Sequence, residues 1–143
     1  MLDRRRFVLA AAASAFVTPA MAAAGRSPIK MRALYNKDLT FSDLARQLEG
    51  RRILVDGYMA PPLKAESSFF VLTKRPMAVC PFCETSADWP DDIVAIYTQR
   101  IVNVLPFNVK IVTNGRLELG EFRDPETGFV SRVRLVGAHV TRA

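Results

Sequence analysis

The chain contains one histidine, two cysteines and one tryptophan among 143 residues. A single histidine excludes metal motifs that need two histidines from one chain. Two cysteines are too few for a disulfide-stapled scaffold or for a zinc site built from four cysteines. The sequence also lacks a glycine-rich phosphate-binding loop and a Gly-x-Ser-x-Gly motif, so it carries no signature of P-loop nucleotide binding or of α/β-hydrolase chemistry.

The overall composition indicates one ordinary globular domain. Half of the residues are hydrophobic, 24% are charged, and the formal net charge is +6. This apolar content is too high for a disordered chain. The basic residues are scattered, with only short pairs such as Arg51-Arg52 and Lys74-Arg75. We therefore expect no nucleic-acid partner, because nucleic-acid binding needs a basic patch or stripe.

The first 22 residues have the features of an export signal. Basic residues 4–6 precede an apolar run of 11 residues at 7–17, which is too short to span a bilayer because about 20 residues are needed. Residues 20–22 supply a small-residue cleavage site. Residues 4–8 resemble the twin-arginine signal; Asp3 stands where that family has Ser or Thr, so the general secretory route stays open. The sequence predicts a periplasmic or otherwise exported protein without stable membrane insertion after cleavage.

The predicted mature chain begins with a lead-in and a short helix. Cleavage leaves 121 residues with a net charge of +4. Residues 23–38 show no clear periodicity and are predicted to be an extended lead-in to a single β-rich domain at 39–143. Thr40-x-x-Asp43 resembles a capping box, and Gly50 stands where a helix C-cap glycine belongs. The apolar face expected between them consists of Phe41, Leu44, Ala45 and Leu48.

Strands and turns are predicted after this helix. The predicted strands are residues 52–59, 68–73, 77–80, 93–97, 109–113, 116–122 and 129–140. Residues 124–128 have Pro and Gly in positions that suit a turn. Alternation in the last strand places Phe129, Val133, Leu135 and His139 on one face. Two interpretations of His139 on this apolar face stay open: a hydrogen-bonded interior histidine, and a metal ligand.

A seven-residue pattern occurs twice, at residues 53–59 and 111–117. Both segments have apolar residues, then Asp or Asn, then glycine and a return to strand. A glycine inside a strand often marks a bulge or a bend at a barrel corner. We therefore interpret Asn114-Gly115 as part of a bent strand rather than as a two-residue hairpin turn. The predicted fold is mainly β, a small OB-like barrel, closed or partly open, with one short N-terminal helix.

The chemical motif of the chain is Cys80-Pro81-Phe82-Cys83. Two cysteines at this spacing can form a disulfide or share a soft metal ion. Three hypotheses stay open: metal binding, thiol-disulfide exchange, and a structural disulfide in an oxidising compartment. The motif resembles the glutaredoxin-type active site, but Pro90 follows too soon for the long helix of that fold. The resemblance therefore does not extend to the fold.

The residues around the cysteine pair determine which metal would fit. Met77 would add a third soft sulfur atom, a set suited to Cu(I). His139 and a carboxylate such as Glu84 or Asp88 would instead complete a zinc site. The predicted metal ligands are Cys80, Cys83, Met77 and His139, for copper or zinc. The preferred function is non-enzymatic binding or delivery of a soft metal ion, without catalytic residues; the alternatives are a thiol-disulfide oxidoreductase and an interaction module with a structural disulfide.

Several segments together resemble a little-characterised family of short exported bacterial proteins. The shared features are Gly57, residues 70–72 (Phe-Val-Leu), residues 80–83, residues 87–92 and residues 128–131, which span most of residues 50–140. The resemblance implies an OB-like barrel and an accessory role near an ABC transporter. The implied partner is an envelope transporter or another periplasmic protein. The resemblance supplies no catalytic residues.

Overall fold

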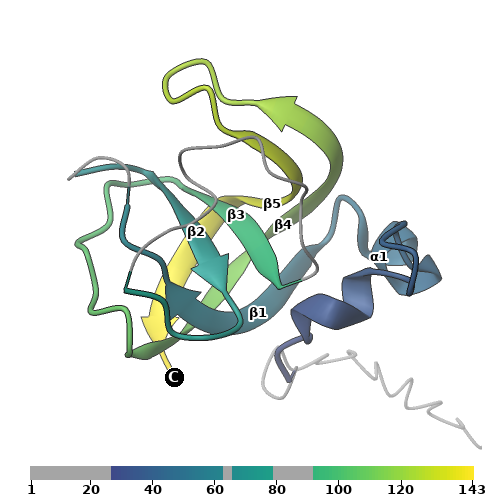
Figure 1. Ribbon diagram of the computed structural model, residues 1–143, viewed down its shortest axis with the longest axis horizontal. Coiled ribbons are helices and arrows are strands. Elements are labelled where there is room, and N and C mark those ends of the chain that lie inside the picture. Colours follow the sequence, from purple (N-terminus) through teal and green to yellow (C-terminus); the bar gives the residue numbers. More distant parts are fainter. Residues whose placement is uncertain (1–26, 63–65, 79–91) are drawn as a thin grey trace, which may run out of the picture.

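A computed structural model describes residues 27–62, 66–78 and 92–143. Its elements are a 3₁₀ helix η1 (Met31–Leu34), a helix α1 (Asp43–Leu48) and the strands β1 (Arg52–Met59), β2 (Phe69–Thr73), β3 (Ile93–Thr98), β4 (Lys110–Arg123) and β5 (Val130–Arg142). The strands form a closed barrel in the order β1-β2-β3-β5-β4 (Figure 1). Only the β3–β5 pair is parallel among these neighbours. The prediction of a mainly β, OB-like fold with one short helix is confirmed.

The strand predictions agree with the structure in most places. Strand β1 has the predicted bounds, and β2 and β3 differ from the prediction by one residue each. Strand β4 runs without interruption from Lys110 to Arg123, so Asn114-Gly115 lies inside a strand as interpreted and is no hairpin turn. The strand predicted at 77–80 is wrong for Met77 and Ala78, which lie outside any strand, and its last two residues lie outside the described residues.

The barrel is filled by apolar side chains from every strand. In β1, buried residues alternate with more exposed ones, because successive side chains of a strand point to opposite faces. Strand β2 differs, since all five of its residues are buried. The fully buried aliphatic residues include Val55, Leu72, Ile96, Ile111, Leu117 and Leu135. In Figure 1 the β4–β5 hairpin extends beyond this barrel. Helices in the described ranges are all too short or too polar to cross a membrane.

The two repeated segments pair with each other. Gly57 on β1 lies opposite Ile111 on β4, and Ile53 lies opposite Gly115. A Cβ added at Gly57 would lie 2.5 Å from the backbone oxygen of Thr73, and one added at Gly115 would lie 2.8 Å from the Cβ of Leu135. Each glycine therefore allows a neighbouring strand to approach more closely than a side chain would permit.

The helix α1 begins later than the sequence predicts. Ser42, rather than Thr40, is the N-cap, and its hydroxyl oxygen accepts a hydrogen bond from the amide of Ala45 at 3.1 Å. The amide and hydroxyl of Thr40 instead donate to Asp38, which lowers the pKa of that carboxyl. Leu44 does not belong to the buried face, because it is 41% exposed. Gly50 follows the C-cap with a φ of 78°, as predicted.

The predicted extended lead-in is wrong for residues 31–34. These residues form η1, and Met31 and Leu34 are buried in the hydrophobic core. The amide of Ile29 also donates to the carbonyl of Leu54 at 2.7 Å, which ties the lead-in to β1. The described part of the lead-in therefore packs as part of the domain, because Ile29, Met31 and Leu34 contribute to the hydrophobic core.

A bulge in β5 changes the face on which His139 lies. His139 pairs with Asn114 and Val136 pairs with Arg116, so two residues of β5, Gly137 and Ala138, lie opposite a single residue of β4. Gly137 has a φ of 59°, which glycine adopts without strain. The extra residue reverses the alternation, so Ala138 is buried and His139 is exposed. The prediction that His139 shares a face with Leu135 is wrong.

Candidate functional site

Cys80 and Cys83 lie outside the described residues, as do Glu84 and Asp88. The chain on both sides of them is described. Thr73 at the end of β2 pairs with Ile93 at the start of β3. The amide of Lys74 donates to the carbonyl of Asp92 at 2.9 Å. The two ends of the segment that carries the cysteines are therefore held next to each other.

The carboxylate of Asp92, directly before β3, is partly buried in an unusual way. Its oxygen Oδ1 is buried and has no hydrogen-bond partner among residues 27–62, 66–78 and 92–143. Buried polar atoms are almost always hydrogen-bonded, because desolvation without a partner costs free energy. Within the part of the chain that the structure describes, this carboxylate oxygen is therefore able to accept a donor or bind a cation. The sequence shows Asp92 only as one of several nearby acidic residues, and the burial of its oxygen is not visible in that pattern.

The structure does not bring Met77 and His139 together. Met77 is half-buried and follows β2, whose last residue pairs with Ile93 at the start of β3. His139 follows Ala138, which pairs with Thr98 at the end of β3. The two predicted ligands therefore belong to opposite ends of that strand. Within the described ranges, no group of three His, Cys, Asp or Glu side chains could hold a metal ion.

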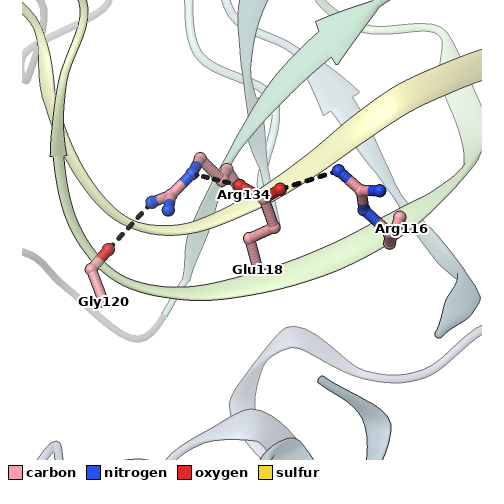
Figure 2. Close-up of polar contacts among 4 residues, drawn as sticks. All are labelled: Arg116, Glu118, Gly120 and Arg134. Atoms are coloured by element: carbon pink, nitrogen blue, oxygen red, sulfur yellow. Dashed lines mark hydrogen bonds and ion pairs between the residues drawn. The ribbon is translucent and has the colours of Figure 1, made fainter. Parts of the chain in front are cut away.

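A second polar group lies across β4 and β5 (Figure 2). Glu118 accepts from Nε of Arg134 at 3.0 Å and from Nη2 of Arg116 at 2.9 Å. Nη1 of Arg134 donates to the carbonyl of Gly120 at 2.8 Å, and its guanidinium lies 4.9 Å from the centre of the Phe122 ring. Because β4 shifts register between Leu119 and Phe122, Arg134 holds the bend of the hairpin. This group is not visible in the sequence pattern, because it depends on strand register.

Aromatic rings fill the space between this hairpin and the barrel. The ring of Tyr97 lies 4.9 Å from that of Phe69 and 6.0 Å from that of Phe122, and Phe69 lies 5.3 Å from Phe129. Burial, followed by the nearby Asp124 carboxylate, raises the pKa of the Tyr97 hydroxyl far above its ordinary value. Tyr97 therefore stays protonated and serves as a packing residue.

The turn predicted at residues 124–128 is organised by Asp124. Its Oδ1 accepts from the amides of Glu126 at 2.8 Å and Thr127 at 3.0 Å. Burial alone would raise the pKa of Asp124, but these amides bring it below its ordinary value of 3.8. Gly128 completes the turn with a φ of 72°, so the turn prediction is confirmed.

Neutralising Asp124 is expected to remove a contribution to stability that depends on pH. A carboxyl whose pKa is lowered by folding stabilises the folded state above its unfolded pKa, and the stabilisation is lost as the pH falls through the folded pKa. Asp124→Asn should therefore be less stable than the wild type at pH 7 and equal to it below that folded pKa. Urea unfolding from neutral to strongly acid pH tests this, with Glu126→Gln as the exposed control. A difference that is constant across this range would contradict it.

Comparison with known proteins adds one similarity in fold. No protein-family model and no curated protein matches the chain. The fold is similar to that of a DUF3299 family protein. That crystal structure, from Pseudomonas aeruginosa PAO1, has a TM-score of 0.54 and 15% sequence identity to this chain, covering 83% of this chain and 97% of the other. At this identity the likeness to the DUF3299 protein shows a shared β-rich fold, while export, the role of the cysteine motif and the transporter partner stay predictions.

Proposed function

We propose that the protein is an exported, non-enzymatic protein that binds a metal ion through Cys80 and Cys83. The observation that supports this is the buried Oδ1 of Asp92, which has no partner in the described part of the chain and directly follows the segment that carries both cysteines. A bound cation would satisfy that oxygen, and a carboxylate beside two thiolates is a donor set that zinc accepts. Asp92 thus favours zinc over Cu(I), which prefers sulfur ligands alone.

Met77 and His139 were also predicted as metal ligands, and the structure places them differently relative to the cysteine-bearing segment. Met77 is three residues from Cys80 and half-buried, but its thioether suits Cu(I) rather than zinc, so we leave it outside the zinc ligand set. His139 is exposed at the other end of β3, so we leave it outside the proposed ligand set. Replacement of Met77 by Leu should leave zinc binding unchanged, and so should His139→Ala.

Elemental analysis of the natively purified protein, with thiol counting, tests the proposal. We expect about one zinc ion per chain, and its loss in Cys80→Ser and in Cys83→Ser, because a single thiolate binds far more weakly. Asp92→Asn should weaken zinc binding by about 100-fold or more, since even outer groups around a metal ligand contribute 10–100-fold. Asp43→Asn, at an exposed aspartate of α1, is the matched control. Metal retained in the double cysteine variant would contradict the proposal.

A further inference from the structure

Arg52 carries a fixed positive charge on the outer surface of the barrel. Its Nε donates to Oδ1 of Asn114 at 3.2 Å, and its Nη2 donates to the carbonyl oxygens of Asn114 and Gly137 at 3.2 and 3.0 Å. The side chain thereby crosses from β1 over β4 to β5. All three acceptors are neutral, and in the described part of the chain Arg52 forms no ion pair. The guanidinium is held in place without being neutralised.

A space that one carbon atom would fill lies above Gly137, next to this charge. A Cβ added at Gly137 would lie 3.5 Å from Nε2 of Gln99 and 3.7 Å from Nη1 of Arg52. Gln99 comes from the chain after β3, and Arg52 comes from β1, so N–H donors from two elements border the same space. Nη1 is the guanidinium nitrogen that the bonds to Asn114 and Gly137 leave unused. The absence of a side chain at position 137 keeps this space open.

The surroundings of the space are basic. Arg116 lies directly opposite Arg52 in the β1–β4 register, and Arg100 follows Gln99 in the chain. Both are exposed. The carboxylate of Glu118 bonds to Arg116 but is shared with Arg134, so one acid faces two arginines. A local excess of positive charge raises the local concentration of anions.

We propose that this space binds an oxyanion, the carboxylate or phosphate group of a partner molecule, between Arg52 and Gln99. Guanidinium and amide N–H groups are the donors that carboxylate and phosphate oxygens accept, and hydrogen bonds with charged partners are the stronger kind. Three hydrogen bonds already hold the Arg52 side chain, so little conformational freedom is lost on binding. A side chain at position 137 would extend toward Arg52 and Gln99 and compete with the bound anion.

Titration with inorganic phosphate and with acetate, at constant ionic strength set by chloride, tests this site. We expect saturable changes in the Nε–H NMR signal of Arg52 with at least one of the two anions. Gln99→Ala should weaken binding about tenfold, the effect of one hydrogen bond to a charged group. Arg52→Lys should weaken it at least as much, because an ammonium cannot reproduce the guanidinium fork. Arg51→Lys, at the exposed neighbouring arginine, should bind as the wild type does.

Filling the space gives an independent variant that keeps both donors. Gly137→Asn should abolish saturation, because asparagine tolerates the left-handed backbone while its side chain occupies the space. Saturation by phosphate alone would assign a phosphate group to the partner, and saturation by acetate alone would assign a carboxylate. No saturation by either anion, or wild-type binding by folded Gln99→Ala protein, would overturn the proposal. Far-ultraviolet circular dichroism establishes that each variant is folded.

Discussion

Gly57→Ala is expected to lower the free energy of unfolding by about 3 kcal/mol, the upper end of the usual cost of overpacking. The added Cβ would lie 2.5 Å from the backbone oxygen of Thr73, 2.9 Å from Cε of Met31 and 3.0 Å from Cγ of Leu72. Met31 can rotate away, but the Thr73 oxygen belongs to the strand that pairs with β1 at this point. Relief of the contact therefore requires β1 and β2 to separate. Urea denaturation at neutral pH measures the loss.

Gly50→Ala is the matched control for this substitution. Gly50 has a φ of 78° but nothing within 4 Å of an added Cβ, so the alanine introduces backbone strain without a contact. Its cost should be about 1–2 kcal/mol, clearly below that of Gly57→Ala. Equal losses in the two variants would show that the close approach of β1 to β2 is not what requires glycine at position 57.

Arg134→Met is expected to lower the free energy of unfolding by about 3 kcal/mol, because it removes the largely buried arginine of an ion pair and leaves both of its partners unsatisfied. The side chain of Arg134 is only 11% exposed, whereas that of Arg116 is 52% exposed. Loss of Arg134 would leave the Gly120 carbonyl without its donor and one oxygen of Glu118 without a partner. Thermal and urea unfolding at low and high salt measure the effect.

Arg116→Met distinguishes the buried pair from the exposed one. It removes the other arginine of Glu118, and its expected cost is below about 1 kcal/mol, as is usual for exposed ion pairs. Glu118→Gln combined with Arg134→Met should cost less than the sum of the single variants, because the two residues interact directly. Strict additivity, or an Arg116→Met loss as large as that of Arg134→Met, would contradict the role assigned to Arg134.

The parts of the fold that the sequence predicted are those determined by local pattern. Strand β1 shows clear alternation, and both its bounds were predicted. Gly57 and Gly115 interrupt apolar strands, where the sequence predicted a bulge or a bend, and β4 shifts register against β5 at Gly115. Gly50 was placed correctly at the end of α1 for a related reason, since glycine alone enters the left-handed region at little cost.

The parts that could not be predicted depend on register or on tertiary packing. A single extra residue at Gly137 moves the following side chains of β5 to the opposite face of the strand. The alternating pattern of the sequence does not predict this bulge. The pairing of Glu118 with Arg134 joins residues on two strands, so only their register brings them together. One oxygen atom of Asp92 is buried, and burial of this kind depends on tertiary packing. The sequence therefore suggests the cysteines as metal ligands, whereas Asp92 enters the proposal only through the structure.

Native mass spectrometry of the purified protein tests the central proposal most directly, because it distinguishes the three states of the cysteine pair. Bound zinc with both thiols ionised gives the mass of the chain plus one zinc ion minus two protons. A disulfide gives the chain mass minus two hydrogen atoms, because its formation removes two protons and two electrons, and a free dithiol gives the chain mass alone. We predict the zinc-bound mass for the wild type, and the chain mass without metal for Cys80→Ser with Cys83→Ser. A wild-type protein that carries only the disulfide mass, and takes up no zinc after reduction, would contradict the proposal.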